Sequence, residues 1–181
     1  MVKYMKNILL LAIGLVITTN FAMAQFEKEK SYIGPSIGFY FHGTTPIFGA
    51  NYEYAMKTDV GDGILGIGGL LRYWSWSDDI GSDWGWDYSD FMIGGQANYH
   101  FKVGDGKIDP WGGLTLAYDV GSVKYKGPSG HYWPKPTWGG FFIGLDGGAR
   151  YWFSNTVAGT VRLNLGSLSY SAIDFGVDFK F

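Results

Sequence analysis

The sequence contains no cysteine, and this absence excludes a disulfide framework and a lipid-attachment cysteine. It also lacks an excess of positive charge, because 14 lysines and arginines stand against 16 aspartates and glutamates. This balance gives no reason to expect nucleic acid as a partner. After residue 24, no segment reaches the roughly 20 apolar residues that a membrane-spanning helix needs. The chain is therefore not predicted to be a disulfide-stapled scaffold, a nucleic-acid binder or a helical membrane protein.

The amino terminus has the three parts of an export signal. Two lysines precede a short apolar core, Ile8–Ile17, and Ala22-Met23-Ala24 supplies the small residues that a signal peptidase reads. The alternative, an uncleaved membrane anchor, needs a longer apolar run than this one. We therefore predict a cleaved signal peptide over residues 1–24, followed by a single domain over residues 25–181.

The closing segment of the chain, Tyr170–Phe181, alternates between apolar and polar side chains. Successive side chains of a strand point to opposite faces, so this pattern predicts a strand with one apolar face. The composition agrees, since 19% aromatic residues and 29 glycines are high for a soluble domain and suit a membrane barrel with aromatic girdles. The apolar face consists of Ile173, Phe175, Val177, Phe179 and Phe181.

The same period of two recurs along the whole domain and predicts eight strands. Short turns alternate with generally longer connections, which is the pattern of outer-membrane barrels with both termini in the periplasm. The two longest connections are expected over residues 75–87 and 121–137. The predicted fold is all-β, an eight-stranded antiparallel up-and-down transmembrane β-barrel. Its strands are expected at about 31–42, 47–57, 64–74, 90–101, 108–120, 138–153, 156–165 and 170–181.

Outward-facing aromatic residues gather near the strand ends in two belts. Aliphatic and small residues separate the belts, and no charged residue lies on an outward face within a predicted strand. A charge there would cost about 2–4 kcal/mol at the midplane of a bilayer, so the pattern favours a membrane-facing surface over a globular core. The outer belt is Phe39, Phe41, Phe48, Tyr73, Phe91, Tyr118 and Phe141, and the inner belt is Tyr54, Tyr99, Phe101, Tyr151, Phe153, Phe179 and Phe181.

Two glycine-rich segments carry a resemblance to a known family. Ile108-Asp109-Pro110-Trp111-Gly112-Gly113-Leu114 and Asp146-Gly147-Gly148-Ala149-Arg150-Tyr151 resemble consecutive middle strands of small outer-membrane proteins of the OmpA-transmembrane, OmpX or OmpW type. The resemblance is one of architecture. It implies a location in the bacterial outer membrane, contact with outer-membrane lipids and lipopolysaccharide, and a monomeric state. It also implies that the barrel-assembly machinery reads Phe179 and Phe181 as an assembly signal.

Charged side chains of both signs point to the barrel interior by strand parity. Eight strands enclose a space just wide enough for side chains to fill, and an unpaired buried charge is costly. The charges are therefore expected to pair, either as a structural plug or as a narrow gated pore in which the arginines exchange partners. The predicted interior network is Glu53, Arg72, Asp119, Asp146, Arg150, Arg162 and Asp174, with Asp178 and Lys180 also inward.

The function predicted from these features is a non-enzymatic outer-membrane barrel with a structural or narrow-pore role and no cofactor. One alternative is a soluble lipocalin-like barrel that holds a small apolar ligand, although such a barrel needs an apolar interior. A second alternative is an enzyme that modifies lipid A, with His42 acting together with serines or acids beyond the third strand. A base and a nucleophile must then lie within hydrogen-bond reach. The residues in question are Ser75, Ser77, Asp78 and Asp79.

The two long connections are rich in acidic and tryptophan residues. The acids do not match the twelve-residue calcium loop, so no metal site is predicted and a solvated acidic loop is expected instead. The tryptophans are expected either to anchor the loops at the headgroup level or to form a surface for a ligand or a host partner. The acids are Asp78, Asp79, Asp83, Asp87 and Asp90, and the tryptophans are Trp76, Trp84, Trp86, Trp133 and Trp138.

Overall fold

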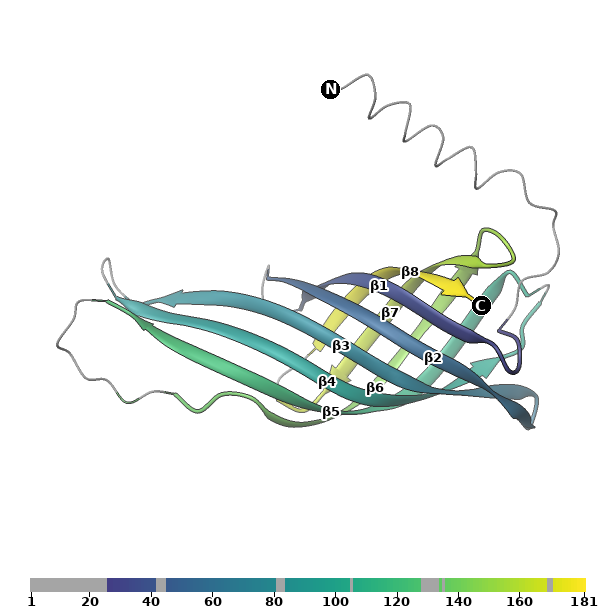
Figure 1. Ribbon diagram of the computed structural model, residues 1–181, viewed down its shortest axis with the longest axis horizontal. Helices are drawn as coiled ribbons and strands as arrows, with labels where there is room; N and C mark the ends of the chain where they lie inside the picture. Colours follow the sequence, from purple (N-terminus) through teal and green to yellow (C-terminus); the bar gives the residue numbers. More distant parts are fainter. Residues whose placement is uncertain are drawn as a thin grey trace, which may run out of the picture.

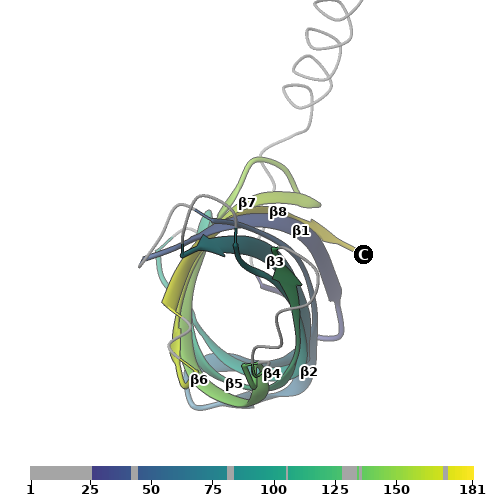
Figure 2. The same ribbon diagram turned by 90° about the vertical axis from the view of Figure 1, so that its left-hand side faces the viewer.

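The chain forms a closed barrel of eight antiparallel strands in sequence order, seen from the side in Figure 1 and nearly along its axis in Figure 2. The computed structural model describes residues 26–41, 45–80, 84–104, 106–127, 134, 136–168 and 171–181. The predicted signal peptide lies outside these residues. The strands are β1 (Ser31–Tyr40), β2 (Pro46–Val60), β3 (Gly63–Asp79), β4 (Gly85–Phe101), β5 (Ile108–Lys126), β6 (Gly140–Trp152), β7 (Val157–Gly166) and β8 (Ser171–Lys180).

The period of two in the sequence determines which side chains face the interior. In β4, Phe91 and Ile93 are exposed on the outside, whereas Met92 between them is buried inside. Pairing of β1 with β8, from Tyr32↔Lys180 to Tyr40↔Ala172, closes the sheet on itself. Within the described part of the chain, no helix is long and apolar enough to cross a membrane. The predicted eight-stranded all-β barrel is thus confirmed.

Four strands, β2 to β5, are longer than predicted. The loop predictions over residues 75–87 and 121–137 are therefore wrong for residues 75–79, 85–87 and 121–126, which are strand. The pairing of β3 with β4 continues through Ser75↔Ser89 to Asp79↔Gly85, and β5 continues beside β4 as far as Lys126. Figure 1 shows β3, β4 and β5 projecting together beyond the other strands. The alternation of side chains does not stop at Trp74. The outward side chains become polar, and a strand with polar outward side chains has the composition of a loop.

The start of β6 also differs from the predicted strand at residue 138. Gly139 and Gly140 have φ angles of +88° and +138°, which residues with a Cβ atom rarely adopt. A Cβ atom on Gly139 would also lie 2.5 Å from the carbonyl oxygen of Asp119. The strand therefore begins only at Gly140, after this turn has brought the chain against β5.

The barrel interior has three layers along its axis. At the end where β1 begins and β8 ends, called here the terminal end, Phe26, Tyr32 and Trp152 belong to an apolar cluster. At the opposite, long-strand end, a second apolar cluster includes Met92 and Phe142. Charged side chains occupy the space between the clusters. The clusters are Phe26, Tyr32, Ala55, Ile64, Trp152 and Ala158 at the terminal end, and Ile47, Leu70, Trp74, Met92, Phe142, Ala117 and Ala172 at the long-strand end.

Candidate functional site

Arg150 is the centre of the charge cluster nearest the terminal end. Its guanidinium donates to three carboxylates, with Nη2 2.6 Å from Glu53, Nη1 3.3 Å from Asp109 and Nε 2.5 Å from Asp178. Thr160 donates a further hydrogen bond to Asp178 at 2.8 Å. These residues come from five different strands, so the cluster ties distant parts of the barrel wall together.

His100 completes this cluster from β4. Its Nε2 lies 3.0 Å from Glu53 Oε1, and its Nδ1 lies 2.8 Å from Asp109 Oδ1. An imidazolium ion, which donates from both ring nitrogens, satisfies both contacts. The ring of Phe26 stacks on the imidazole with centroids 3.5 Å apart, and the Arg150 guanidinium lies 5.4 Å from the same phenyl ring. Phe26 thereby covers the charges from the terminal end.

Arg162 occupies the middle of the interior. Its Nη1 donates to Asp146 Oδ2 at 3.0 Å and to Gln96 Oε1 at 2.5 Å. Thr115 donates to the other oxygen of the Asp146 carboxylate at 3.2 Å. The indole of Trp111 lies 5.4 Å from the guanidinium carbon of Arg162 and 5.1 Å from that of Arg150, so it separates two like charges with an aromatic ring.

Arg72 forms the third pair, towards the long-strand end. Its Nη2 lies 2.8 Å from Asp174 Oδ2 and donates to Asn51 Oδ1 at 2.9 Å. Its Nε also donates to Asp174 Oδ2 at 3.1 Å, and Nη1 donates to the backbone carbonyls of Leu71 and Ala50 at 2.8 and 3.3 Å. Asn164 donates to the same Asp174 oxygen at 3.1 Å. The three arginines are each 1–2% exposed, and each has at least one carboxylate partner.

Asp90 and Asp119 differ from the other buried acids. They lie on neighbouring strands at the long-strand end, where Asp90 pairs with Gly121 and Asp119 pairs with Met92. The indole N–H of Trp138 donates to Asp90 Oδ1, whereas Asp90 Oδ2 and Asp119 Oδ1 have no donor. Among the described residues, no basic side chain forms an ion pair with either of them. Asp119, predicted to belong to the interior network, is thus buried but lies apart from the arginine pairs.

The buried acids outnumber the buried bases. In the described part of the interior, seven buried carboxyl groups face three guanidiniums and one imidazole. Two neighbouring carboxylates repel each other when both are charged, so a proton on Asp90 or Asp119 would remove part of this imbalance. The buried acids are Glu53, Asp90, Asp109, Asp119, Asp146, Asp174 and Asp178.

Sequence reasoning missed several members of the site. His100, Asp109 and Asp90 are absent from the interior network that the sequence predicts. The parity of β4 and β5 could have placed all three inside. Lys180, predicted to face inward, donates to Glu27 at 2.7 Å at the terminal end and is not part of the arginine pairs.

Comparison with known proteins shows which known folds this barrel resembles. No protein-family model matches the sequence, and no curated protein matches it. Solved structures do match in shape. OprG of Pseudomonas aeruginosa superposes with a TM-score of 0.61 at 10% identity, covering 88% of this chain and 99% of that one. The chain has the fold of the small eight-stranded outer-membrane barrels.

Two further structures with this outer-membrane barrel fold are similar. Ail, the attachment invasion locus protein of Yersinia pestis, gives a TM-score of 0.56 at 11% identity and covers 86% of this chain and 100% of its own. The N-terminal β-barrel domain of Pseudomonas aeruginosa OprF gives a TM-score of 0.52 at 17% identity. The match covers 85% of this chain and 98% of that domain. At these identities the likeness concerns the fold alone.

The outer surface of this outer-membrane-type barrel changes character along β3, β4 and β5. Up to Tyr73, Phe91 and Val120 the outward side chains are apolar and exposed. Beyond them, in what we call the extension (Trp74–Asp79, Gly85–Asp90 and Gly121–Lys126), the outward side chains are polar or charged. From β3 to β5 these are Ser75, Ser77, Asp79, Asp87, Ser89, Ser122, Lys124 and Lys126.

The acids of the extension have separate partners. Ser77 donates to Asp87 at 2.6 Å. Lys126 donates to Asp79 at 2.9 Å, and this hydrogen bond raises the pKa of Lys126. Among the described residues, no group of three or more acidic, histidine or cysteine side chains could hold a metal ion. Asp83 and His42, named in the sequence-based alternatives, lie outside the described residues.

The inward face of the extension is aromatic. Trp76 stacks on Tyr88 with ring centroids 4.1 Å apart, and Trp138 packs against both rings at 5.7 and 5.1 Å. Trp86, Tyr88 and Val123 form a small buried cluster. Of the tryptophans expected at the headgroup level or on a binding surface, Trp76 and Trp86 thus lie on the inner side of the extension, and Trp138, which precedes β6, packs against this side. Trp84 precedes β4, and Trp133 lies outside the described residues.

Proposed function

We propose that the protein is a monomeric, non-enzymatic barrel of the bacterial outer membrane whose interior is closed. In this proposal both termini lie in the periplasm and the extension lies outside the cell. The observation that carries the proposal is the filling of the interior. Three buried arginines are held by carboxylates between two apolar clusters, and eight strands leave little space beyond such side chains.

The outward surface supports a position in a bilayer. Between Phe91 and Phe101, β4 presents roughly eleven residues, about the 9–11 that a tilted strand needs to cross the hydrocarbon layer. Its outward side chains over this length carry no charge, whereas Asp87, two outward positions beyond Phe91, is charged. The proposed partners are therefore outer-membrane phospholipids, lipopolysaccharide and, during insertion, the barrel-assembly machinery.

A narrow gated pore is a second candidate, favoured by one observation. The Asp90–Asp119 pair lies at the long-strand end without an arginine partner and leaves oxygen atoms without donors. Such a pair could attract cations to the mouth if the Arg72–Asp174 pair below it opened. An enzymatic role has less support, because Ser77 donates to Asp87 and His100 is buried beneath Phe26.

Cell fractionation tests the proposed location. The protein is expected in the detergent-extracted outer membrane, with the heat-dependent shift in electrophoretic mobility of a folded barrel. Recovery in the soluble periplasm would contradict the proposal and favour the ligand-binding alternative. Reconstitution in a planar bilayer tests closure, and the expected result is no steady current. A constant current large enough for sugars would contradict the closed interior.

A further inference from the structure

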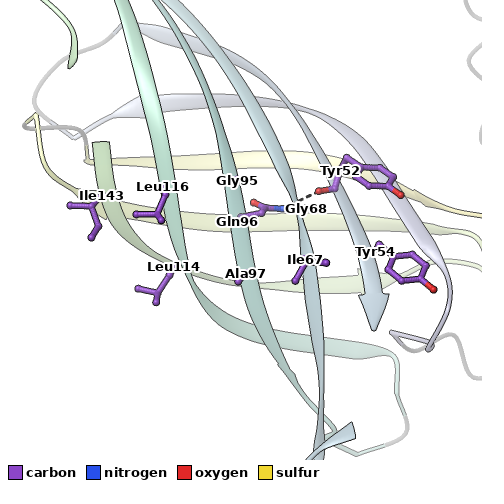
Figure 3. A pocket seen from close by; sticks show the side chains of 10 residues that line it. All are labelled: Tyr52, Tyr54, Ile67, Gly68, Gly95, Gln96, Ala97, Leu114, Leu116 and Ile143. Carbon is purple, nitrogen blue, oxygen red and sulfur yellow. Dashed lines mark hydrogen bonds between the residues drawn. The ribbon is translucent and has the colours of Figure 1, made fainter. Parts of the chain in front are cut away.

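The outer surface of the barrel contains an apolar groove of about 840 Å³ that none of the interior chemistry uses. Figure 3 shows the ten residues that line it, contributed by β2, β3, β4, β5 and β6. Leu114, Leu116 and Ile143 stand on one side, and Tyr52, Tyr54 and Ile67 stand on the other. No charged side chain lines the groove.

Small outward-facing residues create the depression. Gly69 pairs with Gly95 across β3 and β4, and Ile67 pairs with Ala97 one step further along. The outward neighbours Leu71 and Ile93 carry large side chains, so the missing side chains at Gly69 and Gly95 leave the backbone at the floor of the groove. In the next row towards the long-strand end, Leu71 and Ile93 close the groove.

The groove lies at the depth of the hydrocarbon layer. Tyr54, at one end, belongs to the inner aromatic belt, and Tyr73 and Phe91 of the outer belt lie beyond the other end. The hydroxyl of Tyr52 lies 3.1 Å from Ser31 Oγ, so the polar atoms of this wall are directed towards the terminal end. A molecule in the groove would therefore have its polar part at the periplasmic side and its apolar part above Gly95.

We propose that this groove holds one acyl chain of a phospholipid from the periplasmic leaflet. A second copy of the barrel fits less well, because a stable protein interface uses roughly 20–30 residues on each side and the groove has ten. A surface of aliphatic, aromatic and glycine residues without charge matches a hydrocarbon chain. The inference rests on the proposed function, because it requires the barrel to span a membrane.

Gly95→Leu is the variant that fills the groove. A Cβ atom at this position meets only the carbonyl oxygen of Gly68, at 3.7 Å, which is an ordinary contact. The matched control is Gly112→Leu. Gly112 also faces outward, pairing with Tyr99 and Gly147, has no atom within 4 Å of a built Cβ, and does not line the groove.

The experiment uses vesicles of phosphatidylethanolamine and phosphatidylglycerol, from which the inserted barrels are released into mild detergent. Native mass spectrometry then counts the phospholipids that remain bound. The unmodified protein and Gly112→Leu are expected to retain one phospholipid, and Gly95→Leu to bind it about tenfold more weakly or worse. Equal retention by all three proteins, equal loss in both variants, or a dimer that only Gly95→Leu disrupts would overturn the inference.

Heat-modifiability in the same vesicles separates the two proposals. A barrel that inserts and shows the mobility shift but retains no lipid disproves the groove inference and leaves the proposed function intact. A protein that does not insert at all contradicts the proposed function itself.

Discussion

The buried carboxylates make different contributions to stability, and two of them form a matched comparison. Asp174 accepts from Arg72 and Asn164, so Asp174→Asn removes the charge that balances a buried guanidinium. The expected loss in the free energy of unfolding is about 3–5 kcal/mol. Asp119 has a second carboxyl group as its neighbour, so Asp119→Asn is expected to leave stability unchanged or to increase it.

Urea unfolding in lipid vesicles, followed by tryptophan fluorescence, measures both effects. Each substitution converts a carboxyl group to an amide of nearly the same size. Packing is therefore retained, and the comparison isolates the effect of charge. An equal loss of stability in the two variants would show that Asp119 is paired as firmly as Asp174.

Strand parity predicted that these residues face inward, but it could not predict the pairs. Arg72 and Asp174 are 102 residues apart in the sequence, and Arg150 and Glu53 are 97 residues apart. These contacts depend on strand tilt and register around the closed barrel, which no local pattern contains. The parity of β4 places His100 inside, but its partners come from β2 and β5 and could not be predicted for the same reason.

At the scale of the element, β8 and Phe181 allow a test of assembly. The backbone of Phe181 exchanges hydrogen bonds with Ser31 at 3.0 Å in both directions, whereas its side chain is 65% exposed. Replacing the side chain should therefore change the finished barrel little. Phe181→Asp is expected to reduce insertion into the outer membrane while export remains normal, and Phe181→Tyr serves as the aromatic control.

Quantifying heat-modifiable barrel in the outer membrane, alongside refolding of the purified variant into vesicles, checks this expectation. Normal refolding with poor insertion in cells is the expected combination. Normal insertion of Phe181→Asp would count against an assembly signal at this residue.

The extension is where prediction from the sequence failed most, and it also allows a test. The ring of Trp76 stacks on Tyr88 on the inner side of the extension. Its outward neighbours Ser75 and Ser77 are polar, whereas the outward side chains of the membrane strands are apolar, and for this reason the sequence did not predict a strand here. Trp76→Ala is expected to loosen the extension while the barrel below Tyr73 stays intact. Faster limited proteolysis of the extension with an unchanged heat-modifiable core would show this, and Ser75→Ala is the control.

At the scale of the whole molecule, the barrel interior is blocked by three successive layers, two apolar clusters with a charged layer between them. The alternation, the aromatic belts and the inward charges were enough to predict eight strands and their closure into a barrel. The two apolar clusters were not predicted, because Phe26 lies before β1 and Phe142 is a single aromatic among glycines and charged inward neighbours. Each cluster covers one end of a charged layer that water and ions could otherwise enter.

This layering leads to a prediction about conductance. Phe142→Ala removes a buried ring from the long-strand end, and Phe26→Ala removes the ring that covers His100. Because the two clusters lie in series, each single variant is expected to stay without steady current in a planar bilayer. The double variant is expected to show brief openings, and adding Arg72→Ala should make them more frequent, since that change breaks the pair below the long-strand cluster. Steady current in either single variant would mean that one cluster alone closes the barrel, and a silent triple variant would assign closure to the remaining arginine pairs.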